Sequence, residues 1–227
     1  MSTTKSAAKA ELEASLADCY NRMPIVNDLC SNTIPHEQLR EIAMLHYAET
    51  KTFINIKNPA RMYLCPHEAT QAKRYFCYLY EEEQGKFREG MNHADLFKPV
   101  CYGLGLTDNQ LELCYQKYSK SWLHLFHEKP SIETMIRELG VSVAWESLTP
   151  FFGVKLIDSL RDNYQLSSES LKYFTIHYQV DQAHSAYAID TLAQYCSSDR
   201  LMHIAKGAIQ SALIDDLHLL QPYGSIL

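Results

Sequence analysis

Three side chains able to bind a metal lie close together in one segment of the chain. His177, Asp181 and His184 are separated by four and then three residues, the positions i, i+4 and i+7 of a helix. At 3.6 residues per turn they fall within roughly 60° of one another. They therefore project from one face and can share a metal. Neutral imidazole and anionic carboxylate donors suit divalent iron, manganese or zinc better than calcium or magnesium.

Three further candidate ligands lie earlier in the chain. Glu83 ends an apolar helical stripe, and His93 follows it across Gly85 and a second glycine, where the backbone can turn. Glu146 lies in an otherwise apolar stretch, where a carboxylate is costly unless it is paired or bound to a metal. We therefore expect Glu83, His93 and Glu146 to complete the metal site.

Each of these residues also has a simpler interpretation. The two histidines of the 177–184 segment could be ordinary half-buried side chains that hydrogen-bond to Asp181 across a bundle. The run Glu81-Glu82-Glu83 could be a solvated acidic helix end, and Glu146 could occupy an exposed position. Carboxylates at a helix C-terminus oppose the helix dipole, however, so a cation nearby would compensate them.

The composition predicts one soluble domain spanning residues 1–227. The chain has 46% hydrophobic residues, and its 21 Lys and Arg against 27 Asp and Glu give a formal net charge of −6. No segment approaches the ~20 apolar residues of a membrane helix, and no basic stripe is present, so neither a membrane nor a nucleic acid is an expected partner. The N-terminus lacks an apolar signal segment, which favours a cytoplasmic protein.

Helical periodicity runs through nearly the whole chain and predicts an all-α bundle of seven to eight helices around a central metal site. Breaks are expected at Asn58-Pro59, at Gly85 and at Gly140, with a kink from Pro150 and Gly153 beside Glu146. The expected helical ranges are 5–27, 35–58, 66–85, 93–103, 107–129, 131–139, 141–164, 167–195 and a last helix that begins after Ser198.

The six residues, in this order, resemble the ligand set of the heme-oxygenase-like diiron oxidases and oxygenases. In that family three core helices supply Glu plus His, then Glu, then His-xxx-Asp-xx-His. The phrase Glu83-Gln84-Gly85 and the later His93-Ala94-Asp95-Leu96-Phe97 also resemble the family's first core helix and the turn after it. The resemblance covers about 35–220 and extends to members like the Chlamydia protein associating with death domains, on the TenA/PqqC-like superfamily fold.

This resemblance implies two iron ions, with O2 as cosubstrate. We expect one iron to be held by Glu83, His93 and His184, and the other by Glu146, His177 and Asp181, with some carboxylates bridging. Glu82 competes with Glu83 as the first ligand, because some members have a shorter segment between the Glu and the His. The apolar stripe that precedes Glu83 favours Glu83.

The resemblance further implies a non-heme diiron oxidase or oxygenase that acts on a small amino-acid-derived metabolite in natural-product biosynthesis. The reaction would be C–H abstraction, oxidative C–C cleavage or N-oxygenation, supported by an external electron donor, and a homodimer is a possible assembly. Alternatives are a fatty-acid decarboxylase, an aminobenzoate-forming enzyme, a metal-free thiaminase II-like or binding protein, and a hydrolase with one zinc or manganese ion. True heme oxygenases and relatives of pyrroloquinoline-quinone synthase fit the ligand pattern less well.

Two departures from the family pattern bear on the substrate. N-oxygenating members often carry an additional carboxylate upstream of the first core Glu, where this chain has 54–58; Glu49 or Glu68 could substitute only if the loops differ. Aminobenzoate-forming members use a Tyr where this chain has 26–28. A substrate carboxylate would need a cationic side chain in the cavity, and Lys155 and Arg61 are the candidates, although either could simply be an exposed cation.

Overall fold

The computed structural model describes residues 2–23, 28–32, 34–86 and 92–215, and over these ranges all regular secondary structure is helical. The all-α fold class is thus confirmed, although the chain is divided into more helices than the seven or eight expected. The elements are α1 (Ser2–Asn21), α3 (His36–Thr52), η1 (Phe53–Lys57), α4 (Asn58–Leu64), α5 (Thr70–Glu83), α6 (His93–Gly103), α7 (Asp108–Lys120), η2 (Leu123–His127), α8 (Ile132–Glu146), α9 (Leu148–Asp162), α10 (Ser168–Tyr195), α11 (Asp199–Gln210) and η3 (Ser211–Asp215).

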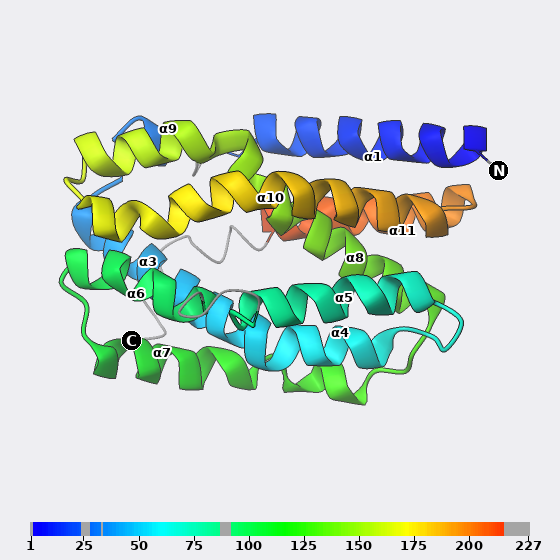
Figure 1. The fold of residues 1–227 in the computed structure, drawn as a ribbon, viewed down its shortest axis with the longest axis horizontal. Coiled ribbons are helices and arrows are strands. Elements are labelled where there is room, and N and C mark those ends of the chain that lie inside the picture. Colours follow the sequence, from blue (N-terminus) through cyan, green and yellow to red (C-terminus); the bar gives the residue numbers. More distant parts are fainter. Residues whose placement is uncertain (1, 24–27, 33, 87–91, 216–227) are drawn as a thin grey trace.

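Helix α10 is the centre of the bundle. It has 28 residues, a length of about 42 Å at 1.5 Å per residue, and it packs against α1, α5, α6, α8 and α9. Helix α1 lies along α10 and α11 on one side of the molecule, and α7 covers α3 on the opposite side (Figure 1). None of the helices formed by the described residues has both the length and the apolar character needed to cross a bilayer.

Two hydrophobic cores flank the middle of α10. One core gathers α1, α5, α8, α11 and the C-terminal part of α10, where Leu192 is fully buried. The other gathers α3, α6, the end of α9 and the N-terminal part of α10, where Leu171 is buried. The buried polar residues His177, Asp181 and His184 lie between these two cores. The long helix therefore carries the candidate ligands across the junction of the two cores.

The predicted break beside Glu146 is present, but Gly140 does not end a helix. Helix α8 runs through Gly140 to Glu146, and α9 begins again after Ser147. A Cβ atom at Gly140 would lie 2.8 Å from the Cβ of Ala208 and 2.9 Å from the carbonyl of Ala205. The absence of a side chain at Gly140 therefore allows α8 to pack closely against α11, and Gly140 does not form a turn.

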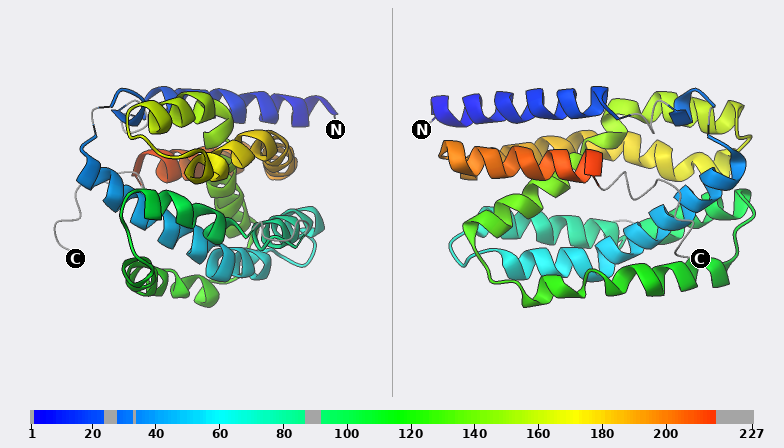
Figure 2. Two further views of the ribbon diagram at one scale, coloured as in Figure 1. Left: turned by 60° about the vertical axis from the view of Figure 1, so that its left-hand side comes forward. Right: turned by 180° about the vertical axis from the view of Figure 1, so that it is seen from behind.

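The predicted break at Asn58-Pro59 is also wrong, because the helical path continues from α3 into α4 (Figure 2). Proline in a regular α-helix clashes with the carbonyl four residues earlier. Here the preceding turn, η1, is π-helical, and the N–H of Asn58 donates to the carbonyl of Phe53, five residues earlier. This wider turn accommodates Pro59 and also rotates Lys57 into the interior, where its side chain is buried.

Two glycines of the bundle should respond oppositely to alanine. Gly140→Ala places a methyl group against the backbone of α11, so we expect a loss of about 1–2 kcal/mol in the free energy of unfolding. Gly207→Ala meets no atom within 4 Å, so the better helix propensity should add about 0.5–1 kcal/mol. Urea unfolding followed by circular dichroism measures both. Equal effects would show that α8 and α11 do not approach as described.

Candidate metal centre

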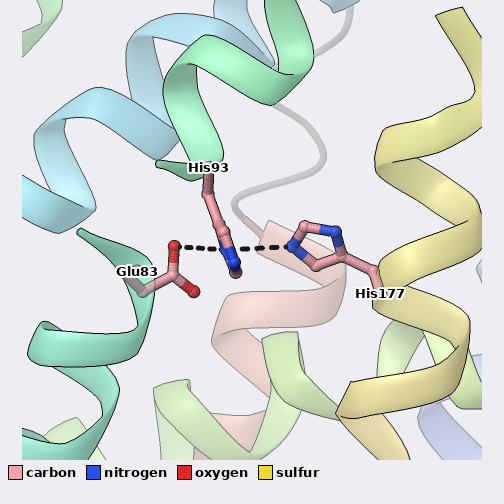
Figure 3. Close-up of side chains that lie close together, drawn as sticks. All are labelled: Glu83, His93 and His177. Carbon is pink, nitrogen blue, oxygen red and sulfur yellow. Dashed lines mark hydrogen bonds and ion pairs between the residues drawn. The ribbon is translucent and has the colours of Figure 1, made fainter. Parts of the chain in front are cut away.

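The first ligand group joins three helices at one point. Glu83 is the last residue of α5, His93 is the first of α6, and His177 lies in the middle of α10. Their side chains point toward one another (Figure 3), with Glu83 Oε2 at 2.7 Å and His177 Nε2 at 3.2 Å from His93 Nδ1. All three are buried, and their donor atoms lie within 4.8 Å of one another.

The second group lies further along α10. Glu146, the last residue of α8, meets Asp181 and His184, and the three side chains are buried with their donor atoms within 4.8 Å. His184 Nδ1 lies 3.2 Å from Glu146 Oε2 and 3.6 Å from Asp181 Oδ1. The two groups together hold all six residues predicted as ligands.

The structure changes how these six residues are divided. The predicted division groups His184 with Glu83 and His93, whereas the structure places His177 there and His184 beside Glu146 and Asp181. Residues seven apart on a helix are separated by about 10 Å along its axis, so the two histidines meet different helix ends. The three residues of α10 therefore divide between the two groups, with His177 in one and Asp181 and His184 in the other.

Backbone and side-chain partners orient the histidine rings. His177 Nδ1 lies 2.8 Å from the carbonyl of Tyr173, so we assign its proton to Nδ1 and leave Nε2 available to a metal. His184 Nε2 lies 3.5 Å from the Tyr78 hydroxyl, which leaves Nδ1 facing the carboxylates. A histidine that binds metal through one nitrogen and hydrogen-bonds through the other is the usual arrangement in proteins.

Glu82 remains close to the first group without belonging to it. Its Oε2 lies 3.4 Å from His93 Nε2, on the side of the ring opposite Glu83, and its side chain is more exposed than that of Glu83. The three donor atoms that cluster include Glu83 and exclude Glu82. The geometry therefore supports Glu83 as the donor and Glu82 as a charged neighbour of His93.

The buried carboxylates of the centre need positive charge nearby. Glu83 and Glu146 both lie at helix C-termini, where the helix dipole is unfavourable to a carboxylate. Burial and the nearby charge of Glu146 raise the pKa of Asp181 to about 7, and the neighbouring His184 opposes them. Burial also raises the pKa of Glu83, a change that the positive charge of His93 opposes. Three carboxylates at this depth need compensating positive charge.

Protons supply that charge when no metal is present. Burial acts to lower the pKa of His93, but Glu83 and Glu82 outweigh it and raise this pKa to about 10. Asp181 and Glu146 likewise raise the pKa of His184 to about 11 against the effect of burial. Burial and the positive charge of His93 lower the pKa of His177 well below its usual value. A divalent cation in each group would replace the protons on His93 and His184.

The second group gives a further sign of a metal site. His184 Nδ1 is buried and makes no hydrogen bond of acceptable geometry among the described residues, although Glu146 Oε2 and Asp181 Oδ1 lie 3.2 and 3.6 Å away. A donor pointed at carboxylates but not bonded to them is what a metal-binding arrangement leaves when its ion is removed. Each group offers imidazole nitrogen and carboxylate oxygen, the donors that iron, manganese and zinc accept.

A cavity of about 260 Å³ opens onto both groups. Glu83 and His177 of the first group and Glu146 and Asp181 of the second contribute to its wall. Most of the remaining lining is apolar and comes from α3, α6, α9 and α10, including Leu39, Ala43, Val100, Phe152, Leu160 and Phe174. The cavity can therefore hold an organic molecule next to the metal ligands and away from bulk water.

Neither cation proposed to bind substrate lies in this cavity. Lys155 is on the exposed face of α9. Arg61 is buried in α4, but its Nε donates to Glu138 Oε2 at 3.0 Å and its guanidinium lies over the Phe53 ring. Among the described residues, no lysine or arginine lines the cavity. Sequence reasoning recognised the charges but could not tell which of them were already paired.

The two possible extra carboxylates also fall elsewhere. Glu68 is exposed in the loop before α5. Glu49 lines the cavity, but it belongs to neither ligand group and pairs instead with Lys57 and Tyr118. Of the segment compared with the aminobenzoate-forming members, 26–27 lie outside the described residues. The only signal for Glu49 was a charged residue on an otherwise apolar stripe of 39–53.

Comparison with known proteins yields one family. The model of a family described as "Iron-containing redox enzyme" matches residues 39–216, a range that contains all six candidate ligands and excludes α1. No match was found among curated proteins.

Proposed function

The chain belongs to the iron-containing redox enzymes of the haem-oxygenase-like superfamily, and from this membership we propose that it is a diiron oxidase that uses O2 to oxidise a small organic molecule. The observation that carries the proposal is the pair of buried three-residue groups on one helix, both opening onto one cavity. The family membership supports iron, and the two separate groups support two ions rather than one.

Six residues would hold the metal. Glu83, His93 and His177 would bind one ion, and Glu146, Asp181 and His184 the other. Two iron ions held in this way would supply the electrons and the Lewis acidity for reducing O2 beside a substrate. The chain itself keeps the ligand rings in one tautomer, through Tyr173 for His177 and through Tyr78 for His184.

The cavity wall determines what can lie beside the metal ligands. The Tyr173 ring lies against the His177 ring, with 4.0 Å between centroids, and its hydroxyl lies 3.0 Å from His46 Nε2. Burial lowers the pKa of His46 to about 4, so His46 is neutral at physiological pH and its Nε2 can accept a hydrogen bond from the Tyr173 hydroxyl. This arrangement holds the Tyr173 ring against the His177 ring in the cavity wall.

A small metabolite derived from an amino acid remains our proposed substrate, with the reaction limited to hydrogen removal, C–C cleavage or N-oxygenation. The cavity lining disfavours a substrate with a free carboxylate, because no basic side chain among the described lining residues could pair with it. A fatty acid fits the apolar lining but meets the same difficulty. An external electron donor would return the metal to its reduced state.

Metal content and O2 consumption test the function together. The protein is loaded with Fe(II) without oxygen, desalted and assayed for iron, and we expect about two irons per chain, one for each ligand group. Addition of air-saturated buffer should then give O2 consumption that a substrate accelerates, screened across amino acids, fatty acids and primary amines.

The same measurements separate the competing functions. A hydrolase with one zinc or manganese ion would turn over without oxygen, and a metal-free binding protein would take up no iron. Fewer than one iron per chain under anaerobic loading would contradict the proposal. Two bound irons without any O2 consumption, across the whole panel and with added reductant, would contradict the oxidase activity.

A further inference from the structure

One charged side chain of the cavity wall is not a candidate metal ligand. Apart from Glu83, Glu146 and Asp181, Glu49 is the charged residue among the described lining of the cavity. It lies on α3, one helical turn after His46, and about 20% of its side chain remains accessible. Since His46 contacts Tyr173 and Tyr173 contacts His177, Glu49 is separated from the first ligand group by two side chains.

Neighbouring residues fix the Glu49 carboxylate in place. Lys57 Nζ lies 2.5 Å from Glu49 Oε1, and the Tyr118 hydroxyl donates to Glu49 Oε2. Burial acts to raise the pKa of Glu49, but Lys57 and Tyr118 outweigh it and lower this pKa below its usual value. The side chain is therefore an oriented anion at neutral pH, and each of its oxygens retains a second lone pair.

The lysine that holds Glu49 is an unusual feature of the fold. Lys57 is only 3% exposed, and its Nζ lies 3.4 Å from the centroid of the Trp122 ring. The π-helical turn η1 places it there, and such turns occur often at functional sites. Lys57 lies outside the cavity lining whereas Glu49 lies in it. The pair therefore presents its negative member to the cavity and keeps its positive member behind the wall.

The rest of the cavity along α3 is apolar. Leu39, Ile42 and Ala43 of α3 lie on one face with His46 and Glu49. Together with Phe53, the first residue of η1, they line the cavity for about 20 Å along the helix axis. On the side of Leu39 the wall is completed by Leu104 and Leu160, and by other apolar residues. A ligand in this space meets apolar contacts on most sides, imidazole and carboxylate at the metal ligands, and one anion at Glu49.

From this arrangement we infer that Glu49 is a specificity-determining residue and that it accepts a hydrogen bond from the protonated amine of a substrate whose remainder is apolar. The inference rests on the proposed function, since the same molecule would extend to the metal ligands. An ammonium group gains a charge-assisted hydrogen bond from Glu49. A carboxylate in its place would face an anion with no basic lining residue to balance it.

Ligand binding without turnover tests this inference. The full chain, loaded with Fe(II) and kept free of oxygen, is titrated in a calorimeter with n-octylamine, 1-octanol and octanoate, which share one apolar tail. We expect the amine to bind about tenfold or more tightly than the alcohol, the effect of one hydrogen bond to a charged group. Equal affinities of amine and alcohol, or tighter binding of octanoate than of the amine, would overturn the inference.

Variants assign the effect to Glu49. In Glu49→Gln the preference for amine over alcohol should fall below about threefold. Because this change leaves Lys57 buried without its carboxylate, the double variant Glu49→Gln with Lys57→Met removes both charges, and it should show the same loss. Glu112→Gln is the matched control, since Glu112 of α7 also pairs with a lysine, Lys51 of α3, but lies outside the cavity. It should keep the full preference, and a preference kept by the double variant would overturn the inference.

The test of Glu49 can fail while the diiron proposal stands, and the reverse is also possible. Iron is assayed in every titrated sample, and the titration is repeated on the metal-free chain. If the chain binds no iron but discriminates amine from alcohol through Glu49, the diiron proposal fails and the assignment of Glu49 stands. If two irons bind and no Glu49-dependent preference is seen in either form, the assignment fails and the diiron proposal stands.

Discussion

Glu146→Ala is expected to reduce bound iron from about two per chain to one or fewer, and to lower O2 consumption by at least about a hundredfold. Glu146 contributes one of three donors in the second group. Loss of a residue that merely orients a metal ligand already costs about 10–100-fold in metal affinity or activity, and loss of a ligand itself should cost more. Iron analysis after anaerobic Fe(II) loading and an oxygen electrode measure the two effects.

The control for this variant lies on the same helix. Glu133→Ala also removes a carboxylate from α8, but Glu133 is in the first turn, about half exposed, and pairs with Arg200. It should retain both irons and full O2 consumption. Circular dichroism of both variants verifies that α8 is intact. Two irons retained by Glu146→Ala would show that Glu146 is not a required ligand of the second ion.

The six candidate ligands were predictable because much of their pattern is local. The spacing of His177, Asp181 and His184 fixes them to one face of a helix whatever else the chain does. Glu83 and Glu146 could be found because each ends or interrupts an apolar run, where an unpaired carboxylate would be costly. The structure brings all of these residues, together with His93, into two buried groups.

The division of these residues into two groups was not predictable in the same way. It depends on which helix end reaches which turn of α10, and therefore on the packing of α5, α6 and α8 around it. Glycine and proline were equally ambiguous from the sequence. Gly140 serves a close helix approach and Pro59 follows a π-helical turn, so neither ends the helix that contains it. Glu138, which pairs with Arg61, and Tyr118, which donates to Glu49, also come from distant segments.

Arg61→Met is expected to destabilise the fold rather than to weaken substrate binding. Arg61 is 1% exposed, its Nε donates to Glu138 Oε2, and its guanidinium lies between the rings of Phe53 and Phe76. Removing one partner of a buried ion pair leaves the other charge without compensation and costs about 3–5 kcal/mol. Urea unfolding of the metal-free chain should therefore show a loss of this size in the free energy of unfolding.

A second variant separates the buried pair from a substrate-binding role. Arg61→Met combined with Glu138→Met removes both charges, so it should recover most of the lost stability, because an apolar pair of similar volume often replaces a buried ion pair without cost. Arg137→Met, at a half-exposed arginine that pairs with Glu128, should change stability by only about 0.5 kcal/mol.

If Arg61 instead bound a substrate carboxylate, the single variant would stay stable and its KM would rise. The double variant would then not restore the original KM. If stability returns in the double variant and KM is unchanged, Arg61 serves the packing of α4 against α8. Glu49 then remains the charged side chain of the cavity wall, apart from the candidate ligands, that can contact a substrate.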